Sequence, residues 1–119
     1  MNTTAKRIVA DVRKAGYEIV TLEQLRPNRW LLIIRDDQGV SRMLLAQQRS
    51  LVSSADVQDL AEMLQLRNIK EGLLLAVDGT FSPVAHRTVL ELRDRRILLC
   101  TSLPSAPTPP NPVPVLSSL

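Results

Sequence analysis

The sequence is poor in residues that bind transition metals or act as nucleophiles. It contains one cysteine, Cys100, and one histidine, His86. This excludes an intramolecular disulfide and a zinc site built from cysteine and histidine ligands. Cys100 ends an apolar run and is expected to be a small core residue. His86 has no serine, cysteine or carboxylate partner at a recognisable spacing, so we expect a partly exposed helix residue.

Aromatic residues and long apolar segments are also scarce. Tyr17, Trp30 and Phe81 are the only aromatic residues, so the core must be built mainly from leucine, isoleucine and valine. No apolar run is long enough to span a bilayer, and the residues from Met1 to Arg7 contain no apolar signal core. We therefore expect a cytoplasmic protein without a membrane partner. The net charge of +3 is compatible with nucleic-acid binding but does not by itself indicate it.

The end of the sequence differs in composition from the rest. No charged residue and no glycine lies beyond Arg96, and six of the eight prolines fall between Pro104 and Pro114. Proline lacks a backbone donor and fixes φ, so such a segment favours an extended, solvated chain. We predict one domain over residues 1–103 and a disordered proline-rich tail over 104–119, which serves as a linker or as a peptide that docks on an aromatic groove.

Turn residues and hydrophobic periodicity divide the domain into alternating helices and strands. The predicted elements are a helix over 4–15, a strand over 17–20, hairpin strands over 30–34 and 43–46, a helix over 53–66, a strand over 72–77, a helix over 82–94 and a strand over 97–100. Two strand-helix-strand crossovers require parallel strands beside the antiparallel hairpin. The prediction is an α/β fold: a three-layer sandwich with a mixed central sheet of about five strands flanked by about three helices.

A short polar signature, Ala46-Gln47-Gln48-Arg49, closes the second hairpin strand. This order of elements resembles the PD-(D/E)XK nucleases, which have the restriction-endonuclease-like fold. Within that superfamily it is similar to the Mrr-type restriction endonuclease branch. There a Gln-X-Lys motif ends the hairpin strand and a Phe-Thr-X-X-Ala-like motif opens a later helix. Here these become Gln47-Gln48-Arg49 and Phe81-Ser82-Pro83-Val84-Ala85, and the resemblance covers about residues 4–100, with further matching stretches at 52–54, 71–79 and 96–99.

The resemblance implies a metal-dependent endonuclease with Gln47 and Arg49 at family-matched catalytic positions. Such enzymes hold a divalent ion, usually Mg²⁺, with carboxylates, and a lysine stabilises the developing charge. The family's first acid lies early in the first hairpin strand. Counting symmetrically about Gln38 places Arg29 opposite Gln47, and no carboxylate lies there. Arg49 replaces the lysine with a cation that keeps its proton, which suits phosphate binding better than catalysis.

Other carboxylates are poorly placed to complete the site. Asp36 and Asp37 lie in or beside the hairpin turn, some 25–30 Å along the strand from Gln47 at about 3.3 Å per residue, so we expect a structural role in the turn. Asp11, the only carboxylate of the first helix, lies late in that helix.

Three functions remain open from the sequence. The leading hypothesis is a catalytically impaired nuclease-fold domain that acts as a DNA-binding or interaction module in DNA defence or processing. In it, Arg49, Arg95 and Arg96 contact the phosphates of double-stranded DNA. The first alternative is an active endonuclease that uses Mg²⁺ through a divergent acid or through residues of a partner subunit or homodimer. The second is a structural protein-interaction domain that does not bind DNA.

Overall fold

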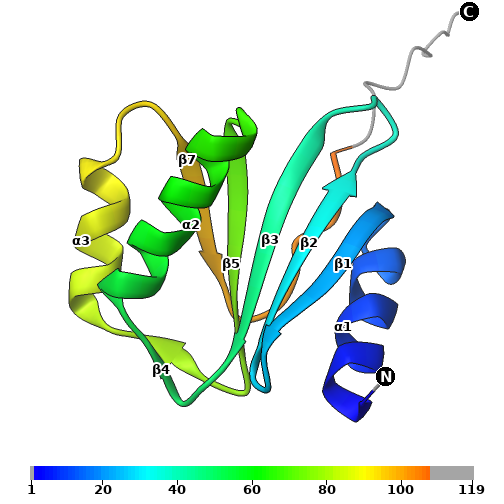
Figure 1. Ribbon diagram of the computed structural model, residues 1–119, viewed down its shortest axis with the longest axis horizontal. Helices are drawn as coiled ribbons and strands as arrows, with labels where there is room; N and C mark the ends of the chain where they lie inside the picture. The colour runs from blue at the N-terminus through cyan, green and yellow to red at the C-terminus, as the bar shows by residue number, and fades with distance from the viewer. Residues whose placement is uncertain (1, 108–119) are drawn as a thin grey trace, which may run out of the picture.

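A mixed five-stranded sheet forms the centre of the protein (Figure 1). The structure is a computed structural model, and it describes residues 2–107. The elements, in chain order, are α1 (Thr3–Lys14), β1 (Glu18–Arg26), β2 (Arg29–Arg35), β3 (Ser41–Gln48), β4 (Leu51–Val52), α2 (Ser54–Arg67), β5 (Glu71–Val77), β6 (Thr80–Phe81), α3 (Pro83–Glu91) and β7 (Arg96–Cys100).

The strands of the main sheet follow the order β1-β2-β3-β5-β7. β1, β2 and β3 pair antiparallel, whereas β3, β5 and β7 pair parallel. The short strands β4 and β6 form a second, two-stranded sheet. The predicted α/β architecture, with a mixed five-stranded sheet and three helices, is therefore confirmed.

Two predicted elements differ from the structure by three residues or more at one end. β1 extends from Glu18 to Arg26 instead of ending at residue 20, because its backbone pairs with β2 although most of its side chains are exposed. α3 ends at Glu91 instead of 94, because Leu92 has an extended backbone conformation. A hydrophobic pattern cannot reveal an exposed edge strand or a helix that unwinds before its polar residues end.

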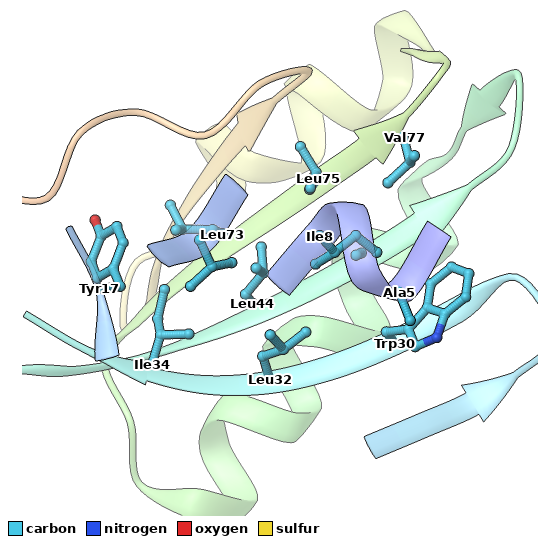
Figure 2. Close-up of a cluster of buried hydrophobic side chains, with 12 residues drawn as sticks. Ala5, Ile8, Tyr17, Trp30, Leu32, Ile34, Leu44, Leu73, Leu75 and Val77 are labelled. Atoms are coloured by element: carbon cyan, nitrogen blue, oxygen red, sulfur yellow. The ribbon is translucent and has the colours of Figure 1, made fainter. Parts of the chain in front are cut away.

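Apolar side chains fill the space on both faces of the sheet, which gives three layers. On one face, Ile8 and Val12 of α1 pack against Leu32 and Leu44, and Figure 2 shows this cluster. On the other face α2 and α3 cover the neighbouring residues of the same strands; the buried members there include Leu31, Met43, Leu45, Val57, Leu60, Leu64 and Ala85. Successive side chains of β2 and β3 point to opposite faces of the sheet, so these two strands contribute to both layers of the core.

Side-chain hydrogen bonds cap the N-termini of α3 and α2. The hydroxyl of Ser82 accepts a hydrogen bond from the backbone N–H of Ala85 at 3.1 Å, and Pro83 follows as the first helical residue, as the sequence indicates. Ser53 precedes α2, and the backbone N–H of Ser53 donates a hydrogen bond to the carboxylate of Asp56 at 3.0 Å. α2 ends at Asn68, which has a left-handed φ of 55°.

The segment after β7 packs back on the domain. The backbone N–H of Ala106 donates to the carbonyl of Ala15 at 2.7 Å, and Leu103 and Ala106 lie against the core on the α1 side. The remainder of the proline-rich segment, residues 108–119, lies outside the described residues. Within the described range no helix is both long enough and apolar enough to cross a membrane.

The hairpin turn between β2 and β3 is built around Asp36. Its Oδ1 accepts hydrogen bonds from the backbone N–H groups of Gln38 and Val40, at 2.9 and 3.0 Å, and its Oδ2 accepts from Arg42 at 2.7 Å. Arg42 also donates to Glu71 of β5 at 2.8 Å. The buried Asp36 therefore has the structural role in the turn that its position indicates.

This arrangement predicts a pH dependence of stability. The hydrogen bond from Arg42, supported by the two backbone donors, lowers the pKa of Asp36 below its ordinary value. A lowered pKa in the folded state stabilises the fold above about pH 4, and this contribution is lost as pH falls through the lowered value. D36N should therefore be less stable than the native protein in urea unfolding at pH 7, and the difference should shrink below about pH 4.

The matched control is D37N, because Asp37 is the next residue and is exposed. D37N should follow the native protein at both pH values. A D36N difference that stays constant from pH 7 to pH 3 would contradict the assigned role of the carboxylate.

Candidate functional site

The polar signature lies at the open end of the hairpin. Gln47 of β3 is paired with Arg29 of β2, and Ala46 with Trp30, which is the register predicted by counting about Gln38. No carboxylate of β2 faces Gln47 in this register. The position that faces the signature therefore carries a guanidinium group.

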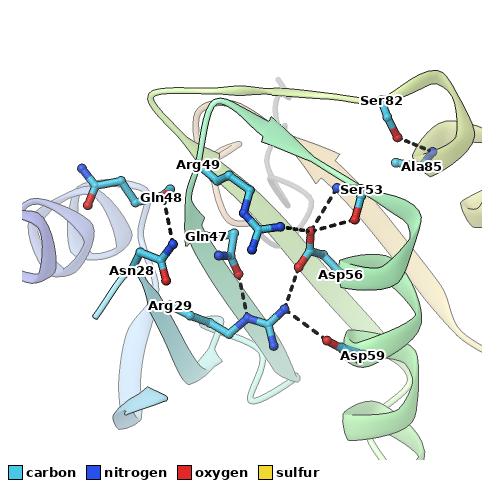
Figure 3. Close-up of polar contacts among 10 residues, drawn as sticks. All are labelled: Asn28, Arg29, Gln47, Gln48, Arg49, Ser53, Asp56, Asp59, Ser82 and Ala85. Carbon is cyan, nitrogen blue, oxygen red and sulfur yellow. Dashed lines mark hydrogen bonds and ion pairs between the residues drawn. The ribbon is translucent and has the colours of Figure 1, made fainter. Parts of the chain in front are cut away.

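Arg29 is the centre of a buried polar network (Figure 3). Its Nε donates to Oε1 of Gln47 at 2.6 Å, and its Nη2 donates to Oδ1 of Asp56 at 2.6 Å and to Oδ2 of Asp59 at 3.2 Å. Arg29, Gln47 and Asp56 are 6%, 1% and 3% exposed, so little solvent screens the ion pair between Arg29 and Asp56. One guanidinium thus joins oxygens from β3 and from α2.

The first two turns of α2 position the two carboxylates. Asp56 and Asp59 are three residues apart and share one face of the helix, which points them at the same guanidinium. Oδ2 of Asp56 also accepts hydrogen bonds from the backbone N–H of Ser53 at 3.0 Å and from its hydroxyl at 3.3 Å. Asp56 is therefore held from two sides, whereas the Asp59 side chain is 45% exposed.

Arg49 lies just beyond β3, at the rim of this network. Its Nη1 is 3.6 Å from Oδ2 of Asp56, longer than a hydrogen bond, and its side chain is 45% exposed. The segment that carries Arg49 passes very close to the backbone at Gly79, where a Cβ atom would overlap the carbonyl oxygen of Arg49. This close approach explains why a residue without a side chain stands at position 79.

No model of a known protein family matches the sequence, and no curated protein matches it. The chain is similar in structure to EndoMS in its apo form, with a TM-score of 0.64 over 91% of this chain and 14% sequence identity. It is also similar to a repair endonuclease from Pyrococcus abyssi, with a TM-score of 0.54 over 89% of this chain and 12% identity. The chain has a restriction-endonuclease-like fold. It spans about half the length of these two proteins, 48% and 49%.

The residues of this restriction-endonuclease-like domain do not fit the divalent ion that the fold implies. The amide oxygen of Gln47 and the carboxylates of Asp56 and Asp59 are of the type that Mg²⁺ prefers. However, the same oxygens already accept hydrogen bonds from Arg29, whose fixed positive charge would lie beside any ion placed among them. Within residues 2–107 no group of three or more histidine, cysteine, aspartate or glutamate side chains is arranged to hold a metal ion.

The structure separates the candidate phosphate contacts predicted from the sequence. Gln47 and Arg49 lie together at the end of β3, whereas Arg95 and Arg96 lie at the start of β7. Strand pairing aligns Arg96 with Glu71, and Arg42 of β3 bonds to Glu71, so this end is about 17 Å along the strands from Gln47 at about 3.3 Å per residue. Asp36 also lies at that far end, away from Gln47, as expected.

Neither His86 nor Cys100 contributes to the site. His86 is exposed near the start of α3, where its ring meets that of Phe81 edge-on at 6.0 Å between centroids. Burial raises the pKa of the Cys100 thiol to about 11, so this residue stays protonated at neutral pH. Its Sγ lies 3.6 Å from the carbonyl oxygen of Leu74 inside the sheet, which agrees with a packing role.

Sequence reasoning missed Asp56 and Asp59. The pattern Ser53-X-X-Asp56 is typical of a helix start and could have placed Asp56 in the first turn of α2. It does not show that this turn approaches the hairpin, because that contact depends on how α2 packs over the sheet. For the same reason the partners of Arg29 could not be read from the chain.

The network predicts unequal effects of two similar substitutions. D56N leaves Arg29 buried without its closest carboxylate, so the free energy of unfolding should fall by about 3–5 kcal/mol. D59N alters the half-exposed partner and should lower it by less than about 1 kcal/mol. Urea unfolding of both variants at pH 7 makes the comparison, and equal small losses would show that the Arg29 pair is not desolvated.

Gly79 provides a second prediction at the site. G79A would place a methyl group against the backbone at Arg49, so it should destabilise the domain by about 1–3 kcal/mol through the forced shift. T80A changes the exposed neighbour and should remain within about 0.5 kcal/mol of the native protein. Thermal unfolding followed by circular dichroism distinguishes the two, and a G79A domain as stable as T80A would refute the close approach.

Proposed function

We propose that this chain is a nuclease-fold domain that binds double-stranded DNA without cutting it, and that it is a divergent relative of the Mrr branch with a degenerate active site. The observation that carries the proposal is the position of Arg29, whose guanidinium lies among the oxygens of Gln47, Asp56 and Asp59. One of the two structural neighbours is a repair endonuclease, which supports a role near DNA.

Loss of cleavage follows from the chemistry of these groups. Phosphodiester hydrolysis by this class of enzyme requires an ion that lowers the pKa of an attacking water and stabilises the charge that develops on the phosphate. A guanidinium cannot bind and activate water as a metal ion does, and Nε and Nη2 of Arg29 donate to protein oxygens. An arginine side chain is a permanent cation, so position 49 does not supply a general base.

The charges of the two ends of the sheet indicate where DNA binds. Near Gln47 the arginines are paired with aspartates, including Arg7 with Asp78 at 2.9 Å, so this end is close to electrically neutral. At the start of β7 a hollow of about 270 Å³ is lined by more positive than negative side chains: Lys70, Arg93, Arg95 and Arg96 against Glu71 and Asp94. Nε of Arg95 is buried there without a hydrogen-bond acceptor.

We therefore assign the main phosphate contacts to Arg95 and Arg96, with Arg49 as a separate contact at the other end. In this proposal residues 1–103 form the DNA-binding domain, and the proline-rich segment from residue 104 is a linker or a docking peptide. The setting is cytoplasmic DNA defence or processing.

The cleavage test uses supercoiled plasmid with Mg²⁺ or Mn²⁺. The native protein should leave the plasmid intact at concentrations at which it binds DNA, and Q47A should behave in the same way. Metal-dependent cutting by the native protein that disappears in Q47A would overturn the proposal in favour of an active endonuclease.

The binding test measures the affinity for a duplex as a function of salt. Binding should weaken as salt rises, and R95Q/R96Q should lower both the affinity and the steepness of the salt dependence, by about two in the log–log slope. R49Q tests the separate phosphate contact proposed at the other end of the sheet. R35Q is the matched control, because Arg35 is exposed and pairs with Glu18. Absence of salt-dependent binding by the native protein would favour a protein-interaction domain without DNA.

A further inference from the structure

The oxygens around Arg29 have the composition of a metal site although a side chain fills it. We infer that the guanidinium of Arg29 is a built-in cation, and that Gln47, Asp56 and Asp59 become a binding site for one divalent ion when this guanidinium is removed. The inference deepens the proposed function and rests on it, because it names the cause of the missing metal chemistry.

The three oxygens converge on one side of a single planar group. Nε and Nη2 are bonded to the same carbon, and they lie 2.6 Å from Oε1 of Gln47, 2.6 Å from Oδ1 of Asp56 and 3.2 Å from Oδ2 of Asp59. Figure 3 shows the three side chains pointing toward the Arg29 guanidinium from β3 and α2. An ion in place of this group would therefore find ligands from two elements without a change of fold.

The charge of these ligands suits a divalent ion. Two carboxylates and one neutral amide carry a charge of −2, and hard cations such as Mg²⁺ and Mn²⁺ prefer oxygen ligands of this kind, completed by water. Asp56 is held in place by Ser53, whereas the half-exposed Asp59 can move to shorten its distance to an ion. The ligand set thus combines one fixed and one adjustable carboxylate.

The native side chain keeps an ion out for two reasons. An arginine side chain is a permanent cation, so the site always holds a positive charge. The guanidinium is also tethered to β2, directly opposite Gln47, so a free ion competes with a cation at a very high local concentration. Arg49 adds a second positive charge 3.6 Å from Oδ2 of Asp56.

In the experiment, R29A and R29Q are titrated with Mn²⁺. Binding is measured by the change in melting temperature and by the electron paramagnetic resonance signal of free Mn²⁺. Both variants should bind one Mn²⁺, and saturation should raise the melting temperature of R29A by about 5–10 °C. The native protein should show no such shift. The double variant R29A/D56N should lose the binding, and R35A, which removes an exposed arginine from the other end of the same strand, should not gain it.

Several outcomes would overturn the inference. One is stoichiometric Mn²⁺ binding by the native protein that is lost in D56N. Another is a folded R29A that binds no Mn²⁺ even when the neighbouring charge is also removed in R29A/R49Q. Variants that stay unfolded at saturating Mn²⁺ would also contradict it, because an ion in the site should restore the lost charge balance.

The two proposals fail in different experiments. If R29A binds no ion, the native protein can still bind DNA without cutting it, and the proposed function stands. If the native protein cuts plasmid in a metal-dependent manner, the proposed function fails whatever R29A does.

Discussion

The contact between Arg29 and Asp56 joins the hairpin to α2, which otherwise packs over it mainly through apolar side chains. Arg29 belongs to the hairpin and Asp56 to the helix that covers it, 27 residues further along the chain. Burying two opposite charges is costly, and their attraction offsets the cost only when the remaining donors and acceptors are also satisfied. Gln47 and Asp59 accept hydrogen bonds from Arg29, and Ser53 donates one to Asp56. The position of α2 over the hairpin and the geometry of the site therefore depend on each other.

In the proposed function, the chain keeps the fold but lacks the metal chemistry usually associated with it. The restriction-endonuclease-like sheet places oxygens at the end of β3 whatever cation lies among them, because backbone pairing sets their position. A side-chain cation and a bound ion can each neutralise these oxygens, but only the ion can activate water. The same architecture therefore supports a structural junction or a catalytic centre, according to which residue faces Gln47.

How far the sequence predicts the structure depends on the range of the interaction concerned. The hairpin register could be derived because a short turn around Gln38 and strands of similar length fix it, and the buried strand β5 is recognisable from its continuous apolar residues. The missing acid opposite Gln47 followed from that register. The exposed edge strand β1 was underestimated, since its pairing with β2 leaves almost no hydrophobic pattern. The carboxylates that pair with Arg29 were missed, because only the packing of α2 brings them to the hairpin.

The Arg29 junction also bears on how the domain responds to heat. The hydration of charged groups becomes less favourable as temperature rises, so the cost of keeping this ion pair out of water falls, while the gain from apolar burial levels off. The balance of forces therefore shifts toward the hairpin and α2 on warming. We expect thermal opening of the domain to begin in elements without such an ion pair, above all in the exposed strand β1 at the edge of the sheet.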